Sequence, residues 1–127
     1  MMGSSSLTRQ VELSPQPSVA RRELTRLLAE EPWKGDVDRV ILAVHEAMVN
    51  SQRHGGGVTH ASACIDHDTV TVEICDRGTG FEVPGNPALV DVAAERGRGL
   101  FLISRLADDV RVARAGADVH LTLTFER

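Results

Sequence analysis

The sequence contains few aromatic residues and few cysteines. Its 127 residues include three Phe, one Trp and no Tyr, so a hydrophobic core must consist mainly of Val, Leu, Ile and Ala. The two cysteines, Cys64 and Cys75, each lie in a strand-like run and not in a CxxC motif. Two such thiols provide no disulfide framework, and we expect both to be small buried side chains.

The chain also lacks long apolar runs and an excess of basic residues. No stretch approaches the roughly 18 consecutive apolar residues of a membrane-spanning helix, and the N-terminus lacks the apolar segment of a signal peptide. We therefore expect a cytoplasmic protein with no membrane partner. The formal net charge of −4 argues against direct binding of nucleic acid, which favours a basic surface, but it is compatible with a basic pocket for one phosphate ligand.

A zinc-protease helix is excluded as well. His45-Glu46 begins as such a motif does, but the motif requires a second His at position 49, which is Val. His45 and His54 are half a turn out of phase on a helix, so they cannot both bind a metal ion from one face.

The remaining composition is that of one globular domain. Hydrophobic residues make up 42% and charged residues 25%, and the length suffices to bury a core without disulfides. We expect residues 1–6 to be disordered and residues 7–127 to form a single domain. The sequence shows no internal repeat and no interdomain linker.

Residues 37–54 have the apolar period of an amphipathic helix. One face carries the apolar side chains of Val37, Val40, Ile41, Val44 and Met48. Asp36 is suited to cap the first turn, and the glycines at 55–57 are suited to end the helix, because glycine reaches the left-handed geometry. We expect the rest of the chain to be organised around this helix.

A polar line runs along another side of the same helix. Glu46, Asn50 and His54 are spaced i, i+4, i+8, and the neighbouring positions 42, 43 and 47 are small or apolar. The carboxylate and the amide would therefore project from a half-buried wall, which indicates a binding site. An ordinary solvated face with one acid, one amide and one histidine is the alternative that this helix alone leaves open.

The other segments predict a sheet with covering helices. Strands are expected at 7–13, 58–65, 69–75, 110–114 and 119–125, and further helices at 19–30, capped by Ser18, and at 99–108. Strands that alternate apolar and polar residues leave one sheet face dry, and helices with apolar stripes cover it. We predict an α+β fold, a two-layer α/β sandwich.

Two glycine-containing segments could bind a ligand. Asp76 ends a strand and is followed by Gly78 and Gly80, so its carboxylate could accept a hydrogen bond from an amine while the glycines admit a flat ligand. Gly97 and Gly99 precede a helix, where unpaired backbone N–H groups favour an anion. Taken singly, an Asp-Gly turn and a flexible loop entering a helix explain these segments equally well.

The segment 82–98 between the two is rich in Pro, Gly and Asn and has little periodicity. Irregular stretches of this length in a compact domain are more often functional than not. Arg96 and Arg98 add positive charge beside the glycines. The segment is not a Walker A loop, which would require Gly-Lys-Ser/Thr at this place.

In combination, these motifs resemble those of a known family. Glu46-xxx-Asn50-xxx-His54 resembles the N-box, Asp76-x-Gly78-x-Gly80 the G1 box and Gly97-x-Gly99-Leu100 the G2 box of the GHKL, or Bergerat-fold, ATPases. Their order and spacing and the short chain are most similar to the branch of anti-sigma factors and serine protein kinases. The resemblance covers residues 8–126 and implies a mixed, mainly antiparallel sheet that about three helices cover on one face.

The resemblance also implies a role for each of these residues. Asn50 would bind Mg²⁺ through its amide oxygen, and Glu46 would be the catalytic residue that orients or deprotonates the attacking hydroxyl. Asp76 would accept the adenine amine of ATP, and residues 82–98 would form a lid. The other contacts to ATP are implied for Gly78 and Gly80 near the base, His54 at the pocket wall, and Arg96, Gly97, Arg98, Gly99 and Leu100 at the phosphates.

The sequence departs from the family pattern before the last strand. Many relatives carry Gly-Thr there, and the Thr helps the Asp to bind the base, whereas this chain has Gly116-Ala117. That support would have to come from Thr122, from water or from nothing. The lid is short, and the N-terminal region lacks a dimerisation histidine, so we do not expect a histidine kinase.

Two functions are compatible with the resemblance. The first is an ATP-binding anti-sigma factor with Mg²⁺-dependent serine kinase activity, which phosphorylates an anti-sigma-factor antagonist and sequesters a sigma factor. The second is a non-catalytic module in which ATP sets the lid conformation and the protein regulates transcription by docking a partner. Glu46 favours the kinase, while Ala117 and the short lid leave room for the module. Either function is compatible with a homodimer, since relatives commonly dimerise, and the sequence leaves the oligomeric state open.

Overall fold

The structure, a computed structural model, describes residues 9–31, 33–78 and 98–127, with the side chains of residues 98–101 left aside. Its elements are β1 (Arg9–Leu13), α1 (Pro17–Glu30), α2 (Val37–His54), β2 (Val58–Ile65), β3 (Thr69–Asp76), α4 (Arg98–Leu106), β4 (Asp109–Ala115) and β5 (Asp118–Glu126). Each predicted helix and strand is present, with ends that differ by a few residues. The expectation for residues 1–6 lies outside the described residues.

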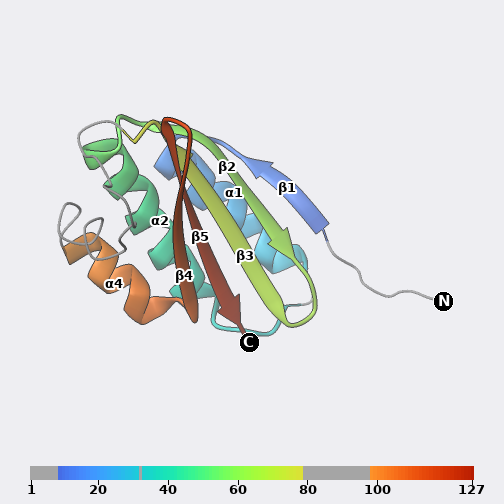
Figure 1. The fold of residues 1–127 in the computed structure, drawn as a ribbon. Coiled ribbons are helices and arrows are strands. Elements are labelled where there is room, and N and C mark those ends of the chain that lie inside the picture. The colour runs from blue at the N-terminus through green and yellow to red at the C-terminus, as the bar shows by residue number, and fades with distance from the viewer. Residues whose placement is uncertain (1–8, 32, 79–97) are drawn as a thin grey trace.

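The five strands form one sheet, in the order β1-β2-β3-β5-β4, and each of the four pairings is antiparallel. The helices α1, α2 and α4 lie together on one face of this sheet (Figure 1). β3 is the central strand, between β2 and β5. The predicted two-layer α+β sandwich is therefore confirmed.

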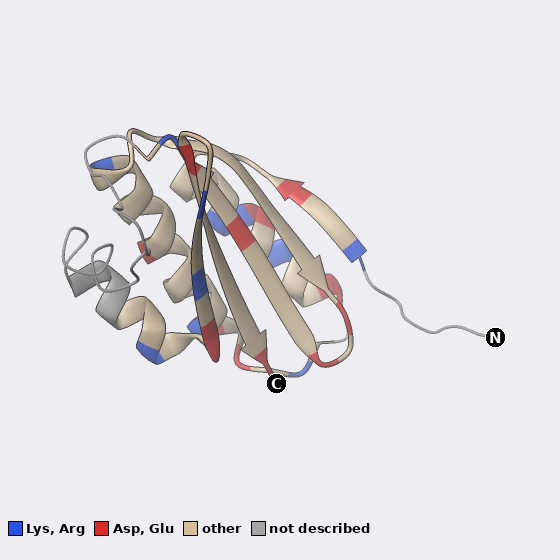
Figure 2. Cartoon of the chain, viewed as in Figure 1, with Lys and Arg blue, Asp and Glu red and all other residues tan. Residues whose placement is uncertain are grey.

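The hydrophobic core lies between the sheet and the helices. Alternate residues of β3 and β5 point toward the helices, and each of them is at most 3% exposed: Val70, Val72, Ile74, Leu121, Leu123 and Phe125. Facing them are Ala20, Leu24, Leu27 and Leu28 of α1 and Val40, Ala43, Val44, Ala47 and Met48 of α2. Charged residues lie mainly at turns, on outer helix surfaces and along β4 (Figure 2).

The central helix α2 begins and ends as the sequence predicts. Its N-cap residue Asp36 accepts a hydrogen bond from the backbone N–H of Arg39 at 3.2 Å. At the other end the N–H of Gly55 donates to the Ser51 carbonyl at 2.7 Å, and Gly56 follows with a φ of 80°. α2 contacts α1 on one side and α4 on the other, so it occupies the middle of the helical layer.

The first helix begins earlier than predicted. α1 starts at Pro17, and its N-cap is Gln16, which makes no side-chain capping bond. The expectation of a Ser18 cap is therefore wrong. Proline is favoured at the first helical position, because its φ is preset and its missing N–H would have no partner there.

The two cysteines differ in burial. Cys75 is buried, as predicted, whereas Cys64 is only half-buried, and both are free thiols. The prediction is wrong for Cys64 because the residue alternates with core-facing Ala63 and Ile65 and so points to the sheet face that the helices leave open. Among the described helices, none is both long and apolar enough to span a membrane.

Candidate functional site

The site is built around Asp76, the last residue of the central strand. Asp76 follows the core-facing positions Val72 and Ile74, so its carboxylate points to the helical side, where it is 1% exposed. The backbone N–H of Gly78 donates to Oδ1 of Asp76 at 2.8 Å. Gly78 has a φ of 67°, which an L side chain rarely adopts, so glycine allows this turn.

The end of α2 touches the same carboxylate. A Cβ atom at Gly55 would lie 2.3 Å from Oδ2 of Asp76 and 2.7 Å from Oδ1, so only glycine leaves room for the Asp76 side chain here. The C-terminus of the helix with the polar line and the strand end with the carboxylate therefore meet. This contact brings together two motifs that the sequence separates by more than twenty residues.

Asn50 contributes a buried polar group to the site. The residue is 6% exposed, and its Nδ2 atom is buried with no hydrogen-bond partner among the residues that the structure describes. Leaving a buried donor unpaired costs about 1–3 kcal/mol, so such a group is retained where a ligand or water satisfies it. An amide offers a donor for a phosphate oxygen and an acceptor oxygen for a hard cation, and this donor set fits Mg²⁺ with a nucleotide.

Glu46 and His54 are placed on either side of Asn50 along α2. Both are half-buried. Residues four apart on a helix are neighbours on its surface, about 6 Å apart, so the structure brings Glu46, Asn50 and His54 into one line as predicted. Its small neighbours Ala43 and Ala47 are fully buried, and the line therefore follows the margin of the core.

The start of α4 lies beside the C-terminal half of α2. Arg39, in the first turn of α2, contacts Asp108 just beyond the end of α4 at 3.3 Å, and the two helices run side by side (Figure 1). α4 has nine residues, a length of about 13 Å, which along an antiparallel α2 reaches from Arg39 to about Met48. This length sets the start of α4, with Gly99 and Leu100, along the C-terminal half of α2, the half that carries Asn50.

The predicted site residues are divided between the described part of the chain and the part outside it. Gly80, Arg96 and Gly97, and the lid segment from 82 to 97, lie outside the described residues, while Arg98, Gly99 and Leu100 form the first turn of α4. The amide end of this turn is a position where backbone N–H groups favour an anion.

The turn between β4 and β5 closes over Gly78. A Cβ at Gly78 would lie 2.9 Å from the Ala117 carbonyl oxygen and 2.9 Å from Cγ2 of Val119. Val119 is also the register partner of Asp76, whereas Thr122 pairs with Glu73 on the opposite sheet face. The idea that Thr122 supports Asp76 is therefore wrong, because strand alternation directs the two side chains to different faces.

Sequence reasoning missed two features of this region. The contact between Gly55 and Asp76 was not expected, because Gly55 was assigned only to ending the helix. A group of His60, Glu73 and Cys75 on the open sheet face was also missed. The signal for it is a period of two within each strand, but the strand register needed to align those residues is not contained in the sequence pattern.

Comparison with known proteins agrees with this geometry. Residues 12–125 match the family model described as the histidine kinase-like ATPase domain. The chain belongs to this family. Membership of an ATPase-domain family means nucleotide binding, and it confirms the family resemblance drawn from the three motifs.

Similarity to one curated protein indicates a branch within this family. The anti-sigma F factor of Clostridium acetobutylicum is 35% identical over 74 residues, which cover 54% of this chain and 52% of the relative. The chain thus spans about half the length of this relative. Within the histidine kinase-like ATPase domain family, the likeness falls on the anti-sigma factor branch.

Proposed function

We propose that this chain is an ATP-binding anti-sigma factor that uses Mg²⁺-ATP to phosphorylate a serine of an anti-sigma-factor antagonist. The observation that carries the proposal is the Nδ2 donor of Asn50, which is buried without a hydrogen-bond partner among the described residues and lies on the helix whose C-cap, Gly55, contacts Asp76. Membership of the family and the likeness to an anti-sigma F factor support it.

At the phosphate end, residues of α2 would bind the metal ion and accept the proton, and residues at the start of α4 would bind the phosphates. Asn50 would hold Mg²⁺ through its amide oxygen, and the ion would neutralise phosphate charge. Glu46, one turn earlier, would orient the serine hydroxyl and accept its proton while the phosphoryl group passes to the serine oxygen and ADP leaves. The N–H groups of Gly97, Gly99 and Leu100, with Arg96 and Arg98, would bind the phosphates.

At the base end, Asp76 would accept a hydrogen bond from the adenine amine. Its fixed position supports this role, because Gly78 donates to Oδ1 and Gly55 leaves no space for another side chain against the carboxylate. Gly78 and Gly80 would line the base, and His54 would form part of the pocket wall. Residues 82–98 would cover the bound nucleotide.

The partners belong to the same proposal. The protein substrate would be the anti-sigma-factor antagonist, and the sequestered partner would be a sigma factor. The name of the relative from Clostridium acetobutylicum motivates the sigma factor, and the resemblance of the sequence motifs to the anti-sigma factor and serine kinase branch motivates the antagonist. A homodimer would be the assembly in which the chain binds them.

A non-catalytic module is the second candidate. In it, ATP would set the conformation of the lid, and the protein would regulate transcription by docking a partner without phosphate transfer. Ala117 favours this candidate, because it stands where many relatives carry a Thr that supports the base-binding Asp, and Thr122 lies on the other sheet face.

The two candidates differ in a phosphotransfer assay. The purified chain is incubated with Mg²⁺-ATP and a cognate antagonist, and phosphoserine on the antagonist is measured. We expect transfer by the wild type, none by Glu46→Gln, and nucleotide affinity retained in that variant. Asn50→Ala should lose the Mg²⁺-dependent part of ATP affinity, whereas Gln52→Ala, an exposed change on the same helix, should behave as wild type. Binding without transfer would leave the module, and absence of ATP binding would refute both candidates.

A further inference from the structure

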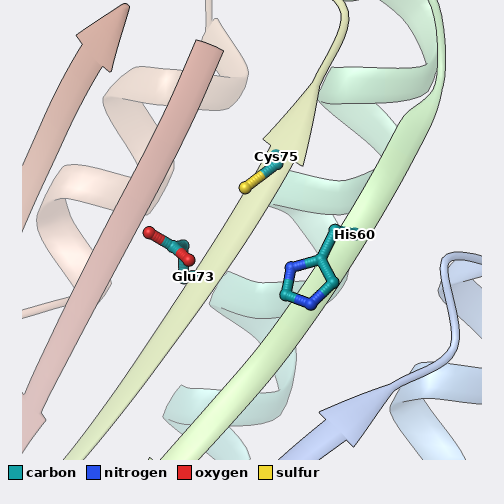
Figure 3. A group of neighbouring side chains, drawn as sticks. All are labelled: His60, Glu73 and Cys75. Carbon is teal, nitrogen blue, oxygen red and sulfur yellow. The ribbon is translucent and has the colours of Figure 1, made fainter. Parts of the chain in front are cut away.

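The open face of the sheet carries a group of side chains that the nucleotide site does not use. One ligand atom each from His60, Glu73 and Cys75 lies within 4.8 Å of the others (Figure 3). Their strands explain this proximity. Cys75 of β3 is the register partner of His60 on β2, and Glu73 lies two residues before Cys75 on the same face.

A fourth side chain joins the group from the next strand. His120 of β5 is the register partner of Cys75 on its other side. Nδ1 of His120 lies 3.3 Å from Sγ of Cys75 and 3.4 Å from Oε2 of Glu73. Three adjacent strands therefore present one thiol, two imidazoles and one carboxylate on the same face of the sheet, with Cys75 and Glu73 in contact with His120 and grouped with His60.

The ring of His60 is held in the manner of a metal ligand. Its Nε2 lies 2.5 Å from Oε1 of Glu12 on β1, so Nδ1 is the nitrogen that remains for a ligand. Histidines that bind metal ions commonly pair their other ring nitrogen with a carboxylate, which fixes the ring and raises its basicity.

The surroundings of the group favour a cation. Burial and the negative charges of Glu73, Asp118 and Asp76 raise the pKa of the Cys75 thiol to about 11. The same negative charges attract a positive ion, which in turn favours the thiolate once it is bound. The imidazoles and the carboxylate remain partly accessible, with side-chain exposures of 48% for His60, 34% for His120 and 41% for Glu73, so an ion can enter from solvent.

We propose that His60, Glu73, Cys75 and His120 form a binding site for a borderline-soft divalent metal ion of the Zn²⁺ class on the open face of the sheet. Thiolate and imidazole ligands select such ions over Mg²⁺, which prefers oxygen ligands in octahedral geometry. In a tetrahedral zinc site the donor atoms lie about 3.3–3.7 Å apart. The two pairs of donor atoms that include His120 already have such separations, and a donor atom of His60 lies within 4.8 Å of the Glu73 and Cys75 donor atoms.

This metal site is independent of the proposed function. It lies on the sheet face opposite to Asp76 and Asn50, and it uses none of the residues assigned to the nucleotide. A failure of ATP binding or of phosphate transfer would therefore not refute the metal site. Likewise, a failure of metal binding would not refute the proposed function.

The test is metal binding by the full chain, purified without an affinity tag and stripped with a chelator. Zn²⁺ is titrated by calorimetry, and Co²⁺ is titrated by absorption spectroscopy, where thiolate ligation gives a charge-transfer band and tetrahedral geometry gives strong visible bands. We expect one ion per chain, with a dissociation constant on the order of micromolar or tighter. A large excess of Mg²⁺ should not displace it.

Variants locate the site. Cys75→Ser should abolish the charge-transfer band, and His60→Asn and His120→Asn should each weaken Zn²⁺ binding by at least about tenfold. Cys64→Ser is the matched control, because Cys64 is the other free cysteine and lies on the same open face, on the neighbouring strand β2, and this variant should bind Zn²⁺ as wild type does. Circular dichroism and thermal unfolding without metal verify that each variant is folded.

Three results would overturn the proposal. The first is the absence of Zn²⁺ binding by the wild type at micromolar concentrations. The second is binding that survives both Cys75→Ser and His60→Asn in folded protein, which would place the ion elsewhere. The third is a Co²⁺ spectrum without a thiolate band, since Cys75 is the central ligand of the site.

Discussion

At the scale of single residues, Asn50 combines a cost in stability with a proposed role in binding. Its side chain is buried, and its Nδ2 donor has no partner in the described parts of the chain, residues 9–31, 33–78 and 98–127. A core position on the middle helix would be more stable with an apolar side chain of similar size. The sequence retains the amide at this position, which is the pattern expected when a group serves a ligand and not the fold.

Asn50→Leu should therefore separate stability from binding. Without nucleotide, we expect the variant to be as stable as wild type or more stable, by up to about 1–3 kcal/mol, because the unpaired donor is removed. Mg²⁺-ATP should no longer raise its unfolding temperature, whereas it should raise that of wild type. Denaturant unfolding and thermal unfolding with and without Mg²⁺-ATP measure both effects. A variant that loses stability and keeps the nucleotide response would contradict this interpretation of Asn50.

Cys75 yields a prediction about pH. The pKa of its thiol is raised from an ordinary 9.0 to about 11, mainly by burial. In a Cys64→Ser background, alkylation of Cys75 by iodoacetamide should be slow at neutral pH and should accelerate as pH rises toward 11. The folded state holds the thiol proton of Cys75 more tightly than the unfolded state does. The contribution of this protonated thiol to folding stability is therefore complete below about pH 9 and is lost between about pH 9 and 11.

Mass spectrometry of the alkylated protein follows this reaction, with the protein unfolded in denaturant as the reference. Alkylation of folded Cys75 at neutral pH as fast as in denaturant would show that the thiol is neither buried nor raised in pKa.

At the scale of elements, the junction of α2 and β3 is the feature on which the site depends. The helix ends against the carboxylate of the strand, with Gly55 in contact with Asp76. Periodicity and capping residues were sufficient to predict both elements, because Asp36 and Gly55–Gly57 define the helix ends locally. They could not predict this contact, which arises only when the helix packs on the sheet.

Gly55→Ala tests the junction. The backbone at Gly55 has a φ of −107°, which alanine tolerates, so the effect comes from the new Cβ lying 2.3 Å from Oδ2 of Asp76. We expect a loss of about 1–3 kcal/mol in stability from this overpacking. Nucleotide affinity should fall at least about tenfold, because the shifted carboxylate is the proposed adenine acceptor.

Gly116→Ala is the matched control. Gly116 has a φ of 64° in the β4–β5 turn, and a Cβ added there would have no neighbour within 4 Å among the described residues, so alanine should cost stability through backbone strain. This variant should lose stability of about 1–2 kcal/mol and keep its nucleotide affinity. Equal nucleotide affinities in the two variants would show that Gly55 has no special relation to Asp76.

At the scale of the whole molecule, a few polar contacts join the helical layer to the far end of the sheet. Arg39 of α2 donates to the Glu126 carbonyl of β5 at 2.9 Å and to Asp108 at 3.3 Å, and its guanidinium lies 6.0 Å from the centre of the Phe125 ring. Asp108 also accepts the N–H of Glu126 at 2.6 Å. One arginine thus connects the start of α2, the end of α4 and the last strand.

Arg39→Met measures how much the contacts of Arg39 contribute to the free energy of unfolding. Methionine keeps the apolar stem beside Phe125 and removes the hydrogen bonds and the charge. We expect a loss of about 1 kcal/mol in the free energy of unfolding, reduced from the value of a buried pair because both side chains are partly exposed. Arg111→Met is the control, since Arg111 is highly exposed and pairs only with Asp109 within the described contacts, and it should cause little measurable change. A larger loss at Arg111 than at Arg39 would refute the argument.

The whole fold was easier to predict than the arrangement of its surfaces. The order of helices and strands follows from local periodicity, and one dry sheet face requires covering helices, so the two-layer sandwich could be predicted. The polar line of Glu46, Asn50 and His54 was also visible in the spacing. The alignment of His60, Cys75 and His120 was not, because it depends on strand register, which the irregularity between Val58 and His60 shifts further.

The position of β4 at one margin of the sheet affects how the protein behaves at high concentration. An edge strand presents unpaired backbone groups to which a strand of another molecule could add. Basic residues lie along this strand (Figure 2), and Arg111 and Arg114 would have to be crowded or desolvated by such a neighbour. We therefore expect these arginines to disfavour edge-to-edge aggregation of the native chain along β4.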